Sequence, residues 1–282
     1  MKPKLGQHYC RLDFTNKRLL MTSKVTPIRL QKTRQPAVSP YFIHIARSES
    51  DLIRAFELVH CSYCKAGLTS DSPSGLRLTP YHLSGHSDVL IAEVGDDVVS
   101  TISLFGDSDL GLPMESMYGN EIAQLREQGF VMAEIGSFAD RRSGVSRFLA
   151  VFIEFTRWLG QVARERRIDT LVAAVHPKHA RLYQRAFGFQ RIGDQTDCPY
   201  VNDNPAVAIY LHLDQLDPRI HERVFGSTID AESLKPCLLD DAVRKRFARL
   251  LNNDSKIADV VGMTNYYHWE TQKTPNNDSE RN

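Results

Sequence analysis

The sequence AEIGSFADRRSGVSRF, residues 133–148, places a strand, a tight turn and a helix start in direct succession. The strand half is apolar except for Glu134, which stands inside the apolar frame. After the strand, the backbone N–H groups of the loop and of the first turn of the helix would point toward one place. Such a helix start attracts anions. A glycine at 144 lets a ligand approach the backbone closely, although many strand-to-helix turns need a glycine for their own geometry. The candidate anion-binding residues are Arg141, Arg142, Gly144, Ser146 and Arg147.

Helix and strand patterns alternate on both sides of this stretch. The spacing predicts helices at about 51–65, 114–129, 147–168 and 178–187, and strands at 89–94, 98–105, 130–140, 170–177 and 206–213. This order predicts an α/β (α+β) domain with a mixed sheet and helices on its faces. The segment 66–88, which contains Tyr81, His82 and Leu83, is dense in turn formers and predicts a long loop, and loops of this length are often functional.

The two ends of the chain differ in composition from its middle. Residues 1–40 carry nine Lys or Arg against the single acid Asp13. This predicts a flexible basic arm, or else loose contact of the arm with an acidic partner or an anionic membrane surface. We divide the chain into this arm, a folded domain at 41–216, and an extension at 217–282 that contains helical patterns and a polar tail.

Charge and cysteine content argue against several classes of protein. The 282 residues include 35 basic and 34 acidic side chains, so the protein is not an evident nucleic-acid binder. No window approaches the apolar length of a membrane span, and a soluble, cytoplasmic protein is expected. The motif CSYC, with Cys61 and Cys64, could indicate a metal or redox pair, but it has no second pair and lies in a helical pattern. We expect reduced thiols and no metal ion.

A second stretch, VHPKHARLYQRAFGFQRIG at residues 175–193, is a strand followed by a cationic helix with a tyrosine one turn in. The cations Lys178, Arg181 and Arg185 lie three or four residues apart, on one face of the helix. This face would suit an acidic partner, and a solvated basic face is the alternative. His176 stands at the strand-to-helix bend, where a structural or substrate-shaping role is favoured over a metal site.

Together, the two stretches resemble the GCN5-related N-acetyltransferase (GNAT) fold. In that fold a Q/R-x-x-G-x-G/A loop binds the pyrophosphate of coenzyme A, and a tyrosine ahead of a Gly-Phe step protonates the departing thiolate. Arg141, Gly144 and Ser146 match the loop, with serine in place of its last small residue, and Tyr183 matches the tyrosine. The resemblance covers about residues 42–213, and it implies a GNAT-like, mostly antiparallel sheet flanked by helices.

A closer resemblance rests on the segments CSYCKAGLTSDSPSGLRLTPYHL, GDSDLGLPMESMYGNEI, AEIGSFADRR, HPKHARLYQRAFGFQRIG and VNDNPAVAIYL. They are similar to the long-chain N-acyl amino acid synthases of the FeeM type, which are related to acyl-homoserine lactone synthases that draw acyl chains from acyl carrier protein. The strand acid of that group corresponds to Glu134. Phe138 stands where the lactone synthases place an arginine, so their recognition of the amine substrate need not carry over.

The chemistry of amide formation gives each candidate residue a role. An acyl thioester reacts with a neutral amine through a tetrahedral oxyanion and releases a thiol. Glu134 can accept the amine proton, directly or through water, and a backbone N–H near Gly136 or Ser137 could donate to the oxyanion. For Glu134 the alternative is a strand-end acid that faces solvent, and for Tyr183 a ring that packs in the core. The candidate substrate-binding residues are Tyr81, Phe138 and His176.

The resemblance implies transfer of a long acyl chain from acyl carrier protein, or from acyl-CoA, to an amino acid, without a tightly bound cofactor. The turn at 141–146 and the helix that begins at 178 would flank a gap in the sheet and share one side of it with Glu134. The cations of that helix would bind the acidic carrier protein. The alternatives are a coenzyme A-dependent N-acetyltransferase, a lactone-type signal synthase that uses S-adenosylmethionine, and a non-catalytic module that holds an acyl carrier or a lipid.

Overall fold

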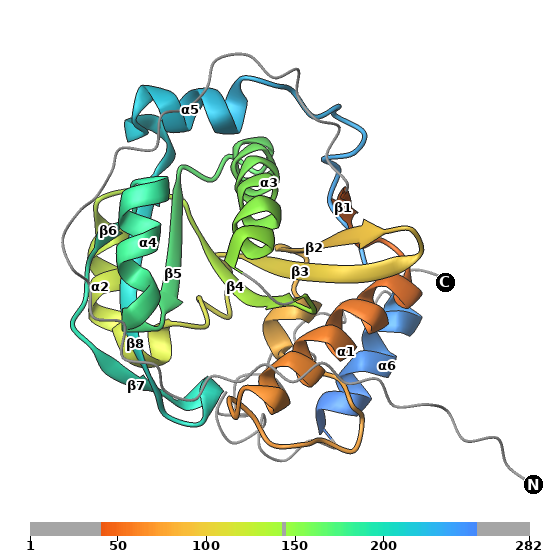
Figure 1. Cartoon of the computed structure of the whole chain (residues 1–282). Helices are drawn as coiled ribbons and strands as arrows, with labels where there is room; N and C mark the ends of the chain where they lie inside the picture. The colour runs from red at the N-terminus through yellow and green to blue at the C-terminus, as the bar shows by residue number, and fades with distance from the viewer. Residues whose placement is uncertain (1–40, 143–144, 253–282) are drawn as a thin grey trace, which may run out of the picture. The chain divides into compact units, whose positions relative to one another are not determined.

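One sheet of eight strands organises the computed structural model, which describes residues 41–142 and 145–252. The order across the sheet is β1-β2-β3-β4-β5-β8-β6, and β7 pairs with β8 (Figure 1). The strands are β1 (Phe42–Ile45), β2 (Ser87–Val94), β3 (Asp97–Gly106), β4 (Met132–Asp140), β5 (Thr170–Val175), β6 (Gln190–Arg191), β7 (Thr196–Cys198) and β8 (Asn204–His212). All the pairs are antiparallel except β4 with β5.

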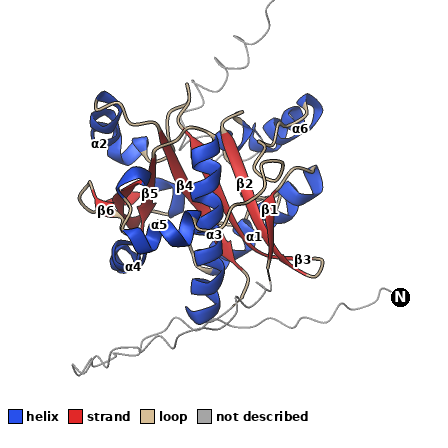
Figure 2. Ribbon diagram, turned by 90° about the horizontal axis from the view of Figure 1, so that it is seen from above, coloured by secondary structure: helices blue, strands red, loops and turns tan. Residues whose placement is uncertain are grey.

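Helices cover both faces of the sheet (Figure 2). One face carries α1 (Glu49–Lys65), α2 (Glu115–Glu127) and α6 (Asp241–Asn252), and the other carries α3 (Val145–Glu165), α4 (Pro177–Phe187) and α5 (Pro218–Phe225). We call these the α1 face and the α3 face. The fold class expected from the sequence, a GNAT-like and mostly antiparallel sheet flanked by helices, is confirmed.

The parallel strands β4 and β5 pair over only three positions, from Met132 with Thr170 to Glu134 with Val172. Beyond this point β4 continues beside β3, and β5 continues beside β8. The two strands therefore part in the middle of the sheet. Because they are parallel and each is followed directly by a helix, the N-terminal ends of α3 and α4 lie at the same end of the sheet as this opening (Figure 1).

A β-bulge bends β4 shortly after the strands part. The register between β3 and β4 shifts between Thr101 and Ser103, and Ser137 has a φ of 49°, in the left-handed region. A bulge leaves one residue out of the hydrogen-bonded ladder and turns the strand away from its partner. Here the bulge lies in the part of β4 that has already parted from β5.

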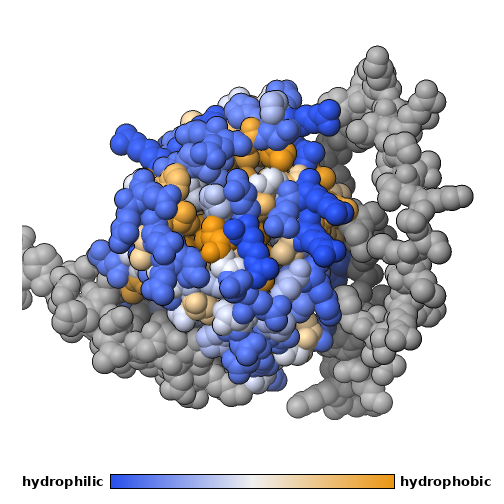
Figure 3. Space-filling view, turned by 90° about the vertical axis from the view of Figure 1, so that its left-hand side faces the viewer, coloured by the Kyte–Doolittle hydropathy of each residue, from blue (hydrophilic) through white to orange (hydrophobic). Residues whose placement is uncertain are grey.

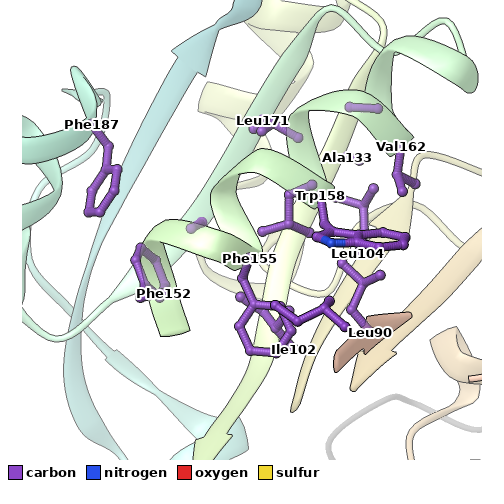
Figure 4. Packing of buried hydrophobic residues seen from close by; sticks show 14 of the residues in the cluster. Leu90, Ile102, Leu104, Ala133, Phe152, Phe155, Trp158, Val162, Leu171 and Phe187 are labelled. Atoms are coloured by element: carbon purple, nitrogen blue, oxygen red, sulfur yellow. The ribbon is translucent and has the colours of Figure 1, made fainter. Parts of the chain in front are cut away.

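The largest apolar cluster lies between the sheet and α3. One side of α3 contributes Phe152, Phe155 and Trp158, and all three are buried against the sheet (Figure 4). Leu104 and Leu171 belong to the same cluster, so it spans strands on both sides of the opening. This packing holds α3 in place although β4 and β5 are not paired over their full length.

The segment beyond residue 216 adds to both faces of the sheet. On the α3 face, Ile229 and Leu234 are buried in the main cluster. On the α1 face, Phe247 and Leu251 are buried against α1 and η1, the 3₁₀ helix Pro80–Leu83. The described residues from 41 to 252 belong to one compact unit. The described part of the extension is therefore integral to the core.

Three short strands were not expected from the sequence. They are β1, β6 and β7, with four, two and three residues, which is too short for an alternating pattern to stand out. The long helix begins at Val145 and ends at Glu165, so the range 147–168 was displaced by two or three residues. The expected loop at 66–88 contains η1 and the first residues of β2.

The surface over α2, α4 and β6 is mainly hydrophilic, with separate hydrophobic areas near its centre (Figure 3). Over the described residues, no helix is both long and apolar enough to cross a membrane. The expectations for the basic arm at 1–40 and the polar tail after 252 fall outside the residues that the structure describes.

Candidate active site

Glu134 lies at the point where β4 and β5 part, and its side chain faces α2. Only 6% of the residue is exposed, which excludes the alternative of an acid that faces solvent. One carboxylate oxygen accepts a hydrogen bond of 2.7 Å from the backbone N–H of Met114, the residue before α2. Burial raises the pKa of Glu134 to about 8, and the charge of Glu115 adds to this effect, while the bond from Met114 opposes it. A carboxyl group with such a pKa can exchange a proton near neutral pH.

Two tyrosines surround this carboxylate. Tyr81 belongs to η1, and Tyr200 belongs to the 3₁₀ helix η2 (Pro199–Val201). Burial raises the pKa of both phenols, and the charge of Glu134 raises both further. The two hydroxyls also interact, which raises the pKa of Tyr81 and lowers that of Tyr200. Both phenols therefore stay protonated and can donate hydrogen bonds beside Glu134. Tyr81, a predicted substrate-binding residue, thus lies near Glu134, whereas Tyr200 was not identified from the sequence.

The loop between α1 and η1 adds a cation to this region. Arg77 donates hydrogen bonds to the backbone carbonyl of Tyr200 and to the hydroxyl of Thr69. Its guanidinium also lies over the Tyr63 ring, 5.2 Å from the ring centre. Arg77 thereby connects the loop, the end of α1 and η2. Its position in GLRLTPYHL is part of the resemblance, but the spacing of that segment gave no indication of this role.

His82 fixes the position of η1 and so of Tyr81. Its Nδ1 accepts the backbone N–H of Thr79 at 3.0 Å, and its Nε2 lies 3.3 Å from the hydroxyl of Ser103 on β3. Burial lowers the pKa of His82 to about 3, so the ring is neutral. The ring packs edge-on against Phe105, as does that of Tyr81. His82 is a structural residue that orients the wall of the site.

Tyr183 and Phe138 lie on the α3 face. The Tyr183 ring packs against Phe152 and Phe189, with ring centres 5.2 and 5.9 Å apart. The Phe138 ring contacts Phe152 and Phe148 of α3 at 5.5 and 5.4 Å. The structure therefore agrees with ring packing for Tyr183, and it places Phe138 in an aromatic cluster rather than beside Glu134.

The expectation that Glu134 shares one side of the sheet with the starts of α3 and α4 is wrong. Successive side chains of a strand point to opposite faces, so Glu134 faces α2, while Ile135 faces α3. The two faces are nevertheless close at the opening. Burial raises the pKa of Tyr183 on the α3 face, and the phenol of Tyr63 on α1 raises it further, so the two phenols lie within electrostatic range.

The anion-binding turn expected at residues 141–147 is only partly described. Arg142 forms a bidentate pair with Asp140, with both distances 3.0 Å, and its guanidinium lies 4.5 Å from the centre of the Tyr41 ring. Arg141 is exposed and has a long contact of 3.8 Å with Asp97. Arg141 is therefore more available to a ligand than Arg142. Gly144 lies outside the described residues, and for Ser146 and Arg147 only the backbone of α3 is described.

The basic face of α4 is present as expected. Lys178, Arg181 and Arg185 are all exposed, and none has an ion-pair partner among the described residues. His176 caps the helix, because its Nδ1 accepts the backbone N–H of Lys178 at 3.1 Å. This cap is a structural role for His176. Ser137 is the bulge residue of β4, where backbone groups leave the regular ladder.

The chain can now be compared with known proteins. The sequence model of one family, described as "N-acyl amino acid synthase FeeM", matches residues 54–213. Among solved structures, FeeM, an N-acyl amino acid synthase from uncultured soil microbes, is 25% identical, with a TM-score of 0.54 over 62% of this chain and 91% of that one. The CoA-dependent acyl-homoserine lactone synthase BjaI is 17% identical, with a TM-score of 0.51 over 74% of this chain and 99% of that one. No curated protein matches the chain.

The parted parallel strands and the bulge in β4, together with the similarity to the FeeM structure, identify the protein as an acyltransferase. Because the FeeM sequence model matches more than half of its residues, the chain belongs to the FeeM family of N-acyl amino acid synthases.

Proposed function

We propose that the protein transfers a long-chain acyl group from the thioester of acyl carrier protein to the amine of an amino acid, in the cytoplasm. The observation that supports this most is the buried carboxyl of Glu134, with a pKa of about 8, at the opening between β4 and β5. An acyl-phosphopantetheine arm would pass through this opening from the starts of α3 and α4. Its carbonyl would then meet the amine on the α1 face.

Glu134 serves as the general base in this proposal. The amine of an amino acid is mostly protonated at neutral pH, and an approaching ammonium group favours the ionised form of a nearby carboxyl. Glu134 takes a proton from the ammonium group, directly or through water, so that the neutral nitrogen can attack, and the nitrogen gives up its second proton to solvent once the C–N bond has formed. A backbone N–H at the bulge, near Gly136 or Ser137, donates to the oxyanion, and the hydroxyls of Tyr81 and Tyr200 orient the acceptor.

Tyr183 serves as the general acid. As the C–S bond breaks, the phenol gives its proton to the departing thiolate and later recovers one from solvent, while Glu134 releases its own. Burial keeps Tyr183 protonated until then, since it raises the pKa of the phenol. The described residues offer its hydroxyl no hydrogen-bond partner, so the proton is not committed to another group.

The donor is tested with purified full-length protein. Long-chain acyl carrier protein, long-chain acyl-CoA and acetyl-CoA are each supplied with a mixture of the twenty amino acids, and the products are identified by mass spectrometry. We expect N-acyl amino acids from the acyl carrier protein, and none from the Glu134→Gln variant. Turnover of acetyl-CoA alone would favour the N-acetyltransferase, and a product that forms only with S-adenosylmethionine would favour the lactone synthase.

The carrier-protein surface is tested by charge reversal on α4. Arg181→Glu and Arg185→Glu should raise KM for the acyl carrier protein and reduce its dependence on salt, with little change in kcat. The matched control is Arg249→Glu on α6, an exposed cation on the opposite face of the sheet. Equal effects of all three substitutions would assign the loss to net charge and would reject α4 as the docking surface.

A further inference from the structure

Three side chains that can bind a metal ion meet at the end of α1. His60 and Cys64 lie one helical turn apart, and Asp71 comes from the loop that follows the helix. Their nearest ligand atoms all lie within 4.8 Å of one another. His60 Nε2 lies 2.9 Å from Asp71 Oδ1 and 3.7 Å from Cys64 Sγ. Of the groups formed by the described residues, this is the one with three such ligands.

The spacing and the ligand types fit zinc. With Zn–S near 2.3 Å and Zn–N near 2.0–2.1 Å, a tetrahedral ion separates sulfur from nitrogen by about 3.6 Å. The distance from His60 Nε2 to Cys64 Sγ is 3.7 Å, and because Sγ also lies 3.9 Å from Nδ1, the cysteine would turn toward the plane of the imidazole ring to bind the same ion. The distance of 2.9 Å between His60 and Asp71 is that of a direct hydrogen bond, and it would open by roughly 0.4 Å around an ion.

We propose that His60, Cys64 and Asp71 bind one Zn²⁺ ion, with solvent as the fourth ligand. A neutral imidazole, a thiolate and a carboxylate are ligands that zinc accepts, and the two negative charges balance the ion. His60 is buried and fixed on the helix, while Asp71 is exposed. The ion can therefore enter from the side of the loop.

The charges that face the cluster include one cation. Arg77 lies within electrostatic range of Cys64, as do Asp71 and Cys61. The Arg77 guanidinium is engaged by Thr69 and by the carbonyl of Tyr200, so it does not occupy the position between the three ligands. Cys61 is exposed on α1 and is not a member of the cluster, although it belongs to the same CSYC motif.

A metal ion at this place would tie the beginning of the loop to α1. The same loop carries Arg77 and leads into Tyr81, which form part of the wall beside Glu134. Binding of the ion to the folded chain alone would also stabilise the fold, in proportion to RT ln(1 + [Zn²⁺]/Kd). The site itself is independent of the reaction that the protein catalyses.

The experiment titrates the full-length, metal-stripped protein with Co²⁺ and then displaces the Co²⁺ with Zn²⁺. We expect one ion per chain, a thiolate-to-metal charge-transfer band, and a Tm that rises with the concentration of Zn²⁺. Cys64→Ser should abolish the band, and Asp71→Asn, an exposed substitution that leaves the core intact, should weaken binding at least tenfold. Cys61→Ser is the matched control and should bind as the wild type does.

Several results would overturn the site. One is Co²⁺ binding without the thiolate band, and another is equal binding by the wild type and Cys64→Ser. Loss of binding in Cys61→Ser but not in Asp71→Asn would assign the ion to the two cysteines instead. A protein that binds neither ion would leave His60 and Asp71 as a simple hydrogen-bonded pair. Circular dichroism of each variant separates lost binding from lost folding.

Discussion

Glu134 provides the sharpest test of the site, because its burial predicts an effect on stability as well as on catalysis. The folded state raises the pKa of this carboxyl from 4.5 to about 8. Between these two values the folded protein holds a proton that the unfolded chain has lost. The free energy of unfolding must therefore fall as the pH rises through this range, because the unfolded state binds fewer protons there.

The size of the effect follows from the pKa. A difference of one pKa unit corresponds to about 1.36 kcal/mol, so the full shift is worth roughly 5 kcal/mol once the carboxyl is ionised in both states. Between pH 6 and pH 8 the wild type should lose about 2 kcal/mol from this group alone. Glu134→Gln has no titrating group at this position, yet it keeps an oxygen that can accept the hydrogen bond from Met114. The variant should therefore gain stability relative to the wild type as the pH rises.

The measurement is urea unfolding of both proteins at half-unit steps from pH 5 to pH 9. The difference between the two free energies of unfolding removes the contributions of the other titrating groups. It should change by up to about 1.36 kcal/mol per pH unit between pH 5 and about 8, and then level off once the carboxyl is ionised in both states. Parallel curves for the two proteins would refute the raised pKa. In the wild type, kcat/KM should also rise with pH toward about 8, since only the ionised carboxyl accepts a proton.

Other substitutions test the acid, the C-terminal extension and the packing of α5. Tyr183→Phe keeps the ring contacts with Phe152, so we expect an unchanged Tm and a fall in kcat of about 10²–10⁴-fold. An unchanged kcat would show that Tyr183 is not the general acid. Phe247→Ala should lower the free energy of unfolding by about 3–5 kcal/mol, and a change below 1 kcal/mol would make α6 a loose appendage. Gly160→Ala should lower the free energy of unfolding by about 1–3 kcal/mol, because the new Cβ would lie 2.3 Å from a methyl group of Val224. An unchanged free energy of unfolding in urea would contradict that contact.

The sequence predicted the long elements better than the short ones. The amphipathic stripe of α3 and the hairpin around Gly95 were recognised, because each repeats a pattern over many residues. The strands β1, β6 and β7 were missed, since two to four residues carry no clear alternation. The apolar residues of the C-terminal extension were visible, but their placement against opposite faces of the sheet depends on partners far away in the chain.

The candidate site shows the same division. The residue types and their order indicated the family: an acid lies inside an apolar strand, and a tyrosine precedes a Gly-Phe step. Local spacing could not show that Met114, Tyr81 and Tyr200 approach Glu134, because they come from three separate loops. Nor could it show that His60, Cys64 and Asp71 converge, since the loop that brings Asp71 back has no regular pattern.

By itself, the sequence determined the class of fold and which side chains can exchange protons, because periodicity and residue chemistry are local properties. The tertiary structure alone decided on which face of the sheet each group lies and how deeply it is buried. Burial of Glu134 removes the water that would otherwise stabilise its charge, and this raises its pKa toward neutral pH. The parting of β4 from β5 and the burial of Glu134 both arise from contacts between distant parts of the chain.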